Sequence, residues 1–291
     1  MKYVIAAFRL LFFIVITLIF TVLLYISYYL LRIFGKNFSI RINYKMTMFI
    51  GLLLRFLLGT RVKVYGKEKI PKKRGFLMAS NHLGYVELMA LLKVVPVAFV
   101  AKDEIEKWPF IGAVATACGT VFVDRDKGGM SEVYINKTSE VLKNRINVWF
   151  APEKTTTDGT WLRPFSSALF VASNRTKHPI VPVVFVLKKL NGKPVKKEDR
   201  VKIAWALKDN GEATPFFKHL THFMTFGRVD LEMHILDPIV ADYDDTDIEQ
   251  RRAFSNKLHA KMSEKLAELE PEFDKERKFL NREEADKVDK E

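Results

Sequence analysis

What this 291-residue chain lacks excludes several classes of protein. It has one cysteine, Cys118, so no internal disulfide can form and a disulfide-stapled secreted scaffold is excluded. That cysteine and the six histidines show no zinc-finger spacing, and we expect no metal site. No G-x-S-x-G sequence occurs, so the nucleophile elbow of a serine hydrolase is missing.

Acidic residues are absent from the first 60 positions. Within this stretch, residues 10–31 carry no formal charge and are mostly Leu, Ile, Phe or Val. A helix of that length covers the roughly 30 Å hydrocarbon core of a bilayer. A cleaved signal peptide is a weaker interpretation, because the run is too long for an h-region and no A-x-A-like site follows. Residues 10–31 are thus expected either to span a membrane or only to insert into one.

Basic residues follow the apolar run directly. Four of them lie between Arg32 and Lys45, which by the positive-inside rule predicts an inner-membrane protein whose remaining chain faces the cytoplasm. A second apolar segment, residues 46–58, is short and interrupted by Arg55. It is expected to be an interfacial helix, with a buried core helix as the alternative. Both segments together predict a membrane anchor with cations placed for anionic lipid.

The composition is that of a folded, basic protein. Hydrophobic residues make up 48% of the chain and charged residues 28%, which permits an ordinary packed core. Lys and Arg number 47 against 34 Asp and Glu, a formal net charge of +13. Such a balance favours anionic partners: phospholipid headgroups, nucleic acid, phosphorylated small molecules or acidic proteins.

From about Arg61 the chain alternates short apolar runs with amphipathic stretches, which predicts an α/β domain with a substantially parallel sheet. Asn191-Gly192 is expected to form the tight turn of a hairpin whose second strand covers residues 201–207. Residues 247–269 are expected to form an amphipathic helix, and residues 272–291 a solvated helix or frayed tail. Further strands are expected over residues 75–80, 98–101, 120–124, 147–150, 180–186 and 228–236, and helices over residues 84–92, 130–143 and 166–174.

The most informative local pattern is Ser80-Asn81-His82-Leu83-Gly84-Tyr85-Val86-Glu87, where a predicted strand gives way to a helix. A histidine there can project from the rim of the sheet, where open α/β folds bind ligands. Glu87 could accept one imidazole N–H and leave the other nitrogen to take a proton. Residues five positions apart do not lie on one face of a helix. The pairing of His82 with Glu87 therefore requires His82 to lie in the turn before the helix.

Three later segments add polar residues after predicted strands. Gly119-Thr120-Val121-Phe122-Val123-Asp124-Arg125 ends with an arginine suited to phosphate oxygens. Phe150-Ala151-Pro152-Glu153-Lys154-Thr155-Thr156-Thr157-Asp158-Gly159 places an acid, a base and hydroxyls in one loop. Val181-Pro182-Val183 follows at a suitable distance.

In this order the segments resemble the glycerolipid acyltransferase family typified by 1-acyl-sn-glycerol-3-phosphate acyltransferases, with its N-H-x4-D, G-x-x-F-x-x-R, F-P-E-G-T and V-P-V motifs. The resemblance covers about residues 60–240. It implies a mixed, largely parallel sheet flanked by helices, which follows the two-helix membrane anchor expected from the apolar segments 10–31 and 46–58. The domains expected are an anchor over 1–60, an acyltransferase domain over 61–245, and a charged C-terminal helix and tail over 246–291.

The resemblance implies a reaction as well. His82, oriented by Glu87, would be the general base that activates the sn-2 hydroxyl of 1-acylglycerol 3-phosphate for attack on an acyl thioester, giving phosphatidic acid. No metal or prosthetic group is implied, and the donor would be acyl-CoA or acyl carrier protein. The expected partners are a phospholipid membrane and the lysophospholipid acceptor, without nucleic acid. The residues expected to bind substrate are Asn81, Lys102, Arg125, Glu153, Lys154 and Thr155.

Three positions depart from the family pattern, and one of them is Ala151, which precedes Pro152 where the family has an aromatic residue. Glu87 stands where the family has Asp, so the start of the helix must absorb an extra methylene. Lys154 replaces the glycine of the third motif, and because lysine adopts a positive φ less readily, the loop is expected to differ in shape. Two alternatives stay open: the same chemistry on another lysolipid, such as lyso-ornithine lipid, and a non-catalytic membrane-tethered binding protein.

Overall fold

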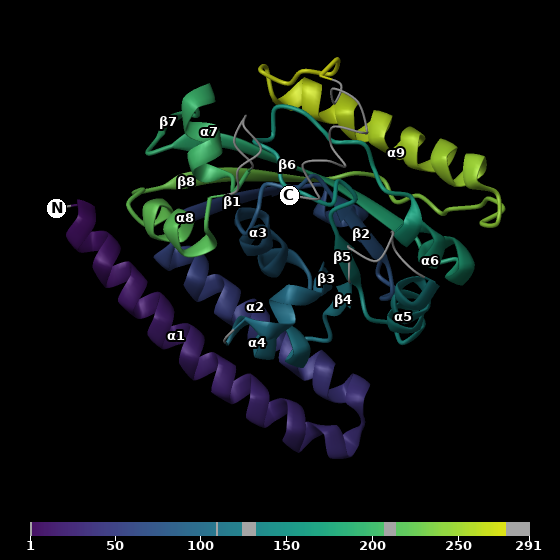
Figure 1. Ribbon diagram of the computed structural model, residues 1–291, viewed down its shortest axis with the longest axis horizontal. Helices are drawn as coiled ribbons and strands as arrows, with labels where there is room; N and C mark the ends of the chain where they lie inside the picture. The colour runs from purple at the N-terminus through teal and green to yellow at the C-terminus, as the bar shows by residue number, and fades with distance from the viewer. Residues whose placement is uncertain (1, 109, 124–131, 207–213, 278–291) are drawn as a thin grey trace.

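The computed structural model describes residues 2–108, 110–123, 132–206 and 214–277. Its centre is a twisted sheet with helices on both faces (Figure 1). Helix α9 lies on one side, together with α5 and α6, while α3, α4 and α8 lie on the other side with the long α1–α2 hairpin outside them. The expected mixed α/β fold, with a sheet flanked by helices, is confirmed.

The elements follow the predicted alternation. The helices are α1 (Lys2–Leu31), α2 (Lys36–Leu57), α3 (Val86–Val94), α4 (Ile111–Ala117), α5 (Glu132–Lys143), α6 (Ala168–Thr176), α7 (Lys197–Ile203), α8 (Phe216–Phe223) and α9 (Ile248–Leu269). The strands are β1 (Thr60–Tyr65), β2 (Leu77–Ser80), β3 (Ala98–Lys102), β4 (Val121–Val123), β5 (Val148–Phe150), β6 (Ile180–Leu190), β7 (Lys193–Pro194) and β8 (Val229–Ile235).

The sheet has the order β1-β8-β6-β2-β5-β3-β4, with β7 paired to β6. The pairs among β6, β2, β5, β3 and β4 are all parallel, so these five strands run in one direction. β8 pairs antiparallel with β6 and parallel with β1. All carboxyl ends of the parallel group therefore lie at one edge of the sheet, the edge where α/β proteins bind ligands.

Strand β6 shows how the sheet separates two cores. Alternate side chains of a strand point to opposite faces. Val183 and Phe185 pack into the cluster that includes α3 and α8, whereas Val184 and Val186 pack into the cluster with α5, α6 and α9. Because both faces are buried, the strand is continuously apolar in sequence, as parallel strands covered on both sides are.

The N-terminal hairpin is attached to the rest of the protein through both of its helices. Gly35, at φ +105°, makes the turn between α1 and α2. Near the start of α1, Arg9 donates to the carbonyl of Met224 at 3.1 Å, and in α2 Nδ2 of Asn43 donates to the Ala117 carbonyl at 3.0 Å. Helix α1 therefore lies along the protein and does not project from it (Figure 1).

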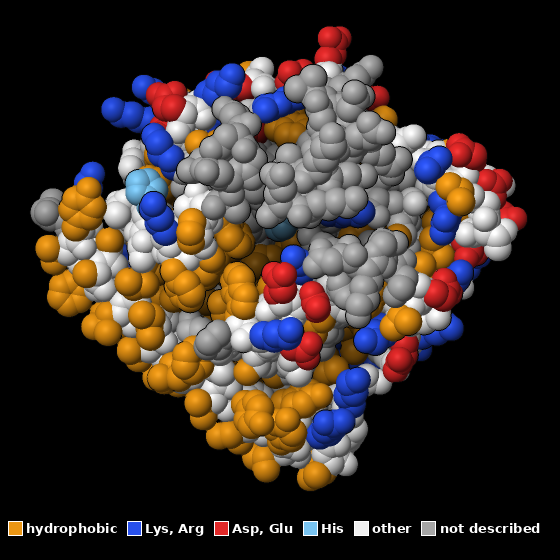
Figure 2. All heavy atoms as spheres, in the orientation of Figure 1, with side chains coloured by type: hydrophobic (Ala, Val, Ile, Leu, Met, Phe, Trp, Pro, Cys, Tyr) orange, Lys and Arg blue, Asp and Glu red, His pale blue; other side chains and the backbone are white. Residues whose placement is uncertain are grey.

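Helix α1 carries an unusually large apolar surface. By length and composition the segment of residues 2–34 could cross a membrane, and only 11% of its most apolar window is buried. Figure 2 shows this hydrophobic surface over α1 and around the tip of the hairpin, with Lys and Arg side chains beside the tip. Helix α2 begins at Lys36, earlier than the expected segment 46–58. It packs between α1 and α3, where Tyr44, Ile50 and Gly51 are buried.

One expectation about the later chain is wrong. Residues 201–203 belong to α7, so the hairpin beyond the confirmed Asn191-Gly192 turn closes on the two-residue strand β7 instead. Residues 272–277 are largely exposed, as expected for a solvated segment, although Phe273 packs partly against the core beneath α9 and the Asp274 amide donates to the Thr160 carbonyl at 2.7 Å. Residues 278–291 of the expected tail lie outside the described residues.

The packing of this segment depends on a buried ion pair. Arg200 contacts Glu270 at 2.6 Å, and their side chains are 3% and 4% exposed. We expect Glu270→Ala to lower the free energy of unfolding by on the order of 3 kcal/mol, because it leaves a buried guanidinium short of a partner. Arg252→Ala, which breaks the exposed Arg252–Glu249 pair, is the control and should change stability by less than about 1 kcal/mol. Equal losses in urea denaturation of the two variants would contradict the role of burial.

Candidate active site

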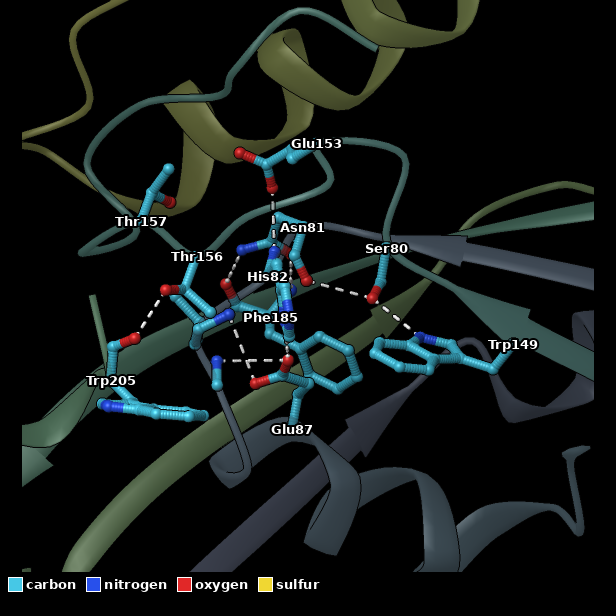
Figure 3. Close-up of polar contacts among 12 residues, drawn as sticks. Ser80, Asn81, His82, Glu87, Trp149, Glu153, Thr156, Thr157, Phe185 and Trp205 are labelled. Atoms are coloured by element: carbon cyan, nitrogen blue, oxygen red, sulfur yellow. Dashed lines mark hydrogen bonds and ion pairs between the residues drawn. The ribbon is translucent and has the colours of Figure 1, made fainter. Parts of the chain in front are cut away.

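The polar motifs meet at the carboxyl edge of the parallel strands. The His82 loop follows β2, Lys102 ends β3, and the loop that begins at Ala151 follows β5. β2 and β3 both pair in parallel with β5, which places their ends side by side. Figure 3 shows that Glu153, from the loop after β5, approaches the His82 loop from the side opposite Glu87.

His82 and Glu87 form the pair that the sequence predicts. Nδ1 of His82 makes a short hydrogen bond to Oε1 of Glu87. His82 lies before α3, which begins at Val86, so the five-residue spacing is bridged by a turn as required. The Glu87 side chain is fully buried, whereas 22% of the His82 side chain is exposed. The imidazole therefore connects a buried carboxylate to the surface.

Backbone amides complete the environment of Glu87. Its Oε2 accepts from the Leu83 amide and its Oε1 from the Gly84 amide, both at 3.2 Å. Gly84 has φ +111°, and a Cβ there would lie 2.8 Å from Cβ of Trp205, so glycine is required on two grounds. The longer side chain of glutamate is thus accommodated by a tight turn that places two N–H groups against it.

These contacts decide which ring nitrogen carries the proton. A carboxylate only accepts hydrogen bonds, and Glu87 already accepts two from the backbone. His82 Nδ1 therefore donates to Glu87, which leaves Nε2 with a free lone pair in the neutral ring. Trp149 packs edge-on against the ring, with centroids 5.9 Å apart, and its Nε1 donates to the Ser80 hydroxyl at 2.9 Å. The arrangement suits a general base acting through Nε2.

Glu153 joins the loop after β5 to the His82 loop, and the substrate contact expected for it stays a prediction. Its Oε1 accepts from the His82 amide at 2.8 Å and its Oε2 from the Arg163 amide at 2.9 Å. The residue is 4% exposed. It therefore ties the two loops together from beneath the surface. Burial raises the pKa of Glu153 to about 8, against the lowering effect of the Arg163 and His82 amides and the Arg163 charge.

Lys154 lies in a strained part of the loop. Its φ is +64°, a left-handed conformation that glycine adopts more readily than lysine. The Lys154 side chain is exposed, and the expected difference in loop shape from the family stays a prediction. Thr155, the next residue, is half-buried.

Asn81 is placed as a structural residue. Its Nδ2 donates to the Phe185 carbonyl at 3.0 Å, and its Oδ1 accepts from the Phe185 amide at 2.7 Å. The side chain is fully buried and attaches the end of β2 to β6 (Figure 3), and its expected substrate contact stays a prediction. Because Asn81 directly precedes His82 in the sequence, this attachment also holds the His82 backbone in place.

Of the two remaining predicted residues, Lys102 and Arg125, the structure describes only Lys102. Lys102 lies at the same sheet edge as His82, and its Nζ forms an ion pair with Glu104 at 2.8 Å. Arg125 follows β4 by two residues in the sequence and lies outside the described residues. Both keep their predicted role as substrate ligands.

Sequence reasoning missed the residues that surround the pair from distant parts of the chain. Trp205 donates from its amide to the Leu83 carbonyl at 2.8 Å, and its own carbonyl accepts from Thr156 Oγ1 at 2.5 Å. The Thr157 amide donates to the His82 carbonyl at 2.8 Å. No sequence motif marks Trp205, because backbone atoms make both contacts.

Comparison with known proteins gives consistent results. Residues 61–186 match the family model described as Acyltransferase. A 1-acyl-sn-glycerol-3-phosphate acyltransferase of Neisseria meningitidis is 35% identical over 120 residues, 41% of this chain and 46% of that protein. A lyso-ornithine lipid O-acyltransferase of Brucella abortus is 27% identical over 235 residues, 76% of this chain and 83% of that protein. The match thus spans less than half of the Neisseria protein.

The fold has a counterpart among solved structures. The crystal structure of the 1-acyl-sn-glycerophosphate (LPA) acyltransferase PlsC from Thermotoga maritima aligns with a TM-score of 0.52 and 21% sequence identity. The alignment covers 86% of this chain and 98% of that one. At this identity the likeness concerns the fold.

The raised pKa of Glu153 predicts a pH-dependent stability. Because the carboxyl keeps its proton up to about pH 8 in the folded protein, its contribution to stability is complete below the pKa of the unfolded chain and is lost as the pH rises towards 8. We expect the melting temperature of Glu153→Gln, relative to the wild type, to rise between pH 5 and pH 8. Thermal denaturation of both proteins across this range measures the difference, and a constant difference would show that Glu153 is already ionised at pH 5.

Proposed function

We propose that this chain, whose residues 61–186 match the Acyltransferase family model, transfers a fatty acyl group from a thioester to the sn-2 hydroxyl of 1-acylglycerol 3-phosphate. The observation that carries the proposal is the His82–Glu87 pair in the turn after β2. A chain that merely bound anionic surfaces by charge would have no use for a histidine oriented by a fully buried carboxylate. That geometry weighs against the non-catalytic alternative.

The reaction follows from the protonation of the pair. Nε2 of His82 takes the proton of the acceptor hydroxyl as its oxygen attacks the thioester carbonyl. Glu87 holds the ring and stabilises the imidazolium that results. The tetrahedral intermediate then collapses, the thiolate leaves, and it receives the proton from His82. The products are the acylated acceptor and the free thiol, and the steps involve no covalent enzyme intermediate, metal or prosthetic group.

An aromatic cluster beside the His82 loop is suited to the acyl chains. The ring of Phe216 lies 5.3 Å from Trp205, 5.4 Å from Trp108 and 5.7 Å from Tyr85, between ring centroids. Trp205 is itself bonded to the Leu83 carbonyl. Apolar surface next to a base favours a substrate whose reactive group is attached to hydrocarbon.

The hairpin would deliver this site to a membrane. Since α1 lies along the protein and the hairpin is attached to it through both helices, we infer that α1 and α2 insert into one leaflet and do not cross the bilayer. The exposed apolar residues on α1 would then lie among acyl chains. The basic residues around the hairpin favour the cytoplasmic leaflet, whose anionic lipids attract Lys and Arg side chains.

Lyso-ornithine lipid is the second candidate acceptor. The Brucella relative named for this substrate matches 83% of its own length, more than the Neisseria relative does. The two acceptors differ in the group that must be bound: a phosphate monoester in one case, and an ornithine headgroup in the other. Acylation assays with both acceptors at equal concentration decide between them.

Loss of the base tests the reaction class. We expect His82→Ala, assayed in detergent with lysophosphatidic acid and a palmitoyl thioester, to abolish product formation while the protein stays folded. Glu87→Gln should lower kcat by about two to four orders of magnitude, since it loses the carboxylate that fixes the ring tautomer. Near-normal turnover by His82→Ala would refute the mechanism. Product from neither wild type nor variant, with either acceptor and with CoA or acyl carrier protein donors, would refute the proposed activity.

Arg125 is expected to bind the acceptor phosphate, as the resemblance implies. Its loss should remove a charge-assisted bond and raise the acceptor KM by about tenfold, with a smaller effect on kcat. Arg252→Ala on α9 is the control for loss of a cation elsewhere. An unchanged KM for lysophosphatidic acid in Arg125→Ala would contradict this role.

A further inference from the structure

A second feature of the protein lies at the opposite end of β2 from His82. A cavity of about 330 Å³ is lined by five cationic residues: Arg41, Lys72, Lys73, Arg74 and Arg145. We call it the basic pocket. Three of its residues immediately precede β2, whereas the catalytic loop follows the same strand. It is therefore distinct from the active site.

Three separate parts of the chain build this pocket. Arg41 lies in the second turn of α2, and its Nη2 donates to the Asn144 carbonyl at 2.8 Å. That bond holds the start of α2 against the turn between α5 and β5. Arg145, in this turn, has φ +58°, a conformation that favours glycine, and yet the position carries a guanidinium.

The positive charges of the pocket are not neutralised within the part of the chain that the structure describes. No carboxylate lines the cavity, and none of its five residues forms an ion pair with a described Asp or Glu. The field extends to His178 nearby: burial lowers the pKa of that histidine, and the charges of Lys73 and Lys143 lower it further. Uncompensated cations around a concave surface favour an anionic ligand.

The position of the pocket identifies the source of that anion. Phe38, three residues before Arg41 on the same helical face, is 45% exposed, and Ile33 and Phe34 in the hairpin turn are 81% and 69% exposed. If the hairpin inserts as proposed above, the pocket meets the leaflet at the depth of the phosphates. Figure 2 shows the Lys and Arg side chains that border the apolar tip.

We propose that the basic pocket binds the phosphate of a membrane phospholipid, as a headgroup site separate from the catalytic centre. Its arginines grip the phosphate oxygens in pairs, and its lysines contribute charge. Occupancy fixes the rotation of the domain about the inserted hairpin. The inference rests on the proposed membrane insertion, although not on the proposed acyl transfer.

Vesicle flotation tests the pocket. The full chain is mixed with vesicles of phosphatidylcholine alone, and binding to these reports insertion of the hairpin. It is also mixed with vesicles that contain phosphatidylglycerol as well. The increase in binding affinity that phosphatidylglycerol causes is called the anionic gain. We expect Lys73→Gln/Arg74→Gln to reduce that gain by about tenfold. The control Arg252→Gln/Lys257→Gln removes the same charge from α9, on the opposite face of the sheet, and should leave it unchanged. Equal effects of the two pairs would overturn the proposal.

A charge-conserving variant separates a pocket from a diffuse positive field. Arg41→Lys/Arg74→Lys/Arg145→Lys keeps every charge and removes the planar forks that grip phosphate. A binding site predicts a loss of at least about threefold in the anionic gain. An unchanged gain would refute the site and leave only general electrostatic attraction. Binding of the variant to vesicles of phosphatidylcholine alone should equal that of the wild type. If the wild type does not bind these vesicles at all, insertion of the hairpin is refuted instead.

Free phosphate is the other source of the same chemistry. Binding of inorganic phosphate and of short-chain, soluble phosphatidylglycerol is measured by calorimetry on wild type and on the lysine variant. Tighter binding of the soluble lipid, weakened in the variant, supports a headgroup site. Tight binding of inorganic phosphate that abolishes the anionic gain would overturn the lipid assignment.

Discussion

The buried charge of Glu87 is the constraint on which the catalytic end of this protein depends. A carboxylate without solvent must be surrounded by donors, and here these are the amides of Leu83 and Gly84 and the imidazole of His82. To bring all three to one side chain, the chain must turn sharply between β2 and α3. Trp205 packs against that turn where a side chain on Gly84 would lie. The turn, the glycine and the orientation of the base are thus consequences of one electrostatic requirement.

Two buried glutamates flank His82 and do different work. Glu87 contacts the ring itself, while Glu153 accepts the His82 amide and fixes the backbone to the neighbouring loop. Their donors explain the difference. Glu153 has two amide partners and no imidazole, so burial outweighs its hydrogen bonds and raises its pKa. The site thus holds one glutamate that orients the imidazole and another, with a raised pKa, that joins two loops.

The parallel sheet separates two chemistries along one short strand. At the carboxyl end of β2 lie His82 and its polar loops, and at its amino end lies the basic pocket beside the hairpin turn. A strand of four residues makes both ends part of the same rigid layer. A membrane that engages the hairpin and the pocket would consequently hold the catalytic edge in a defined orientation. This arrangement supports the proposed function, in which the substrate resides in the bilayer.

The sequence by itself determined the α/β alternation, the apolar N-terminal segment and the His82–Glu87 pair, because these depend on local periodicity and on spacing within eight residues. It did not determine that residues 201–203 are helical, that Phe273 is packed, or that Asn81 and Glu153 are structural, since each depends on partners about 70 or more residues away. The same holds for Lys154, whose left-handed backbone is imposed by the loop around it. The pocket is a further case: helix α2, the segment before β2 and the turn after α5 meet only when the chain is folded. Tertiary contacts decided the roles of these residues, because hydrogen-bond partners and burial are properties of the folded chain.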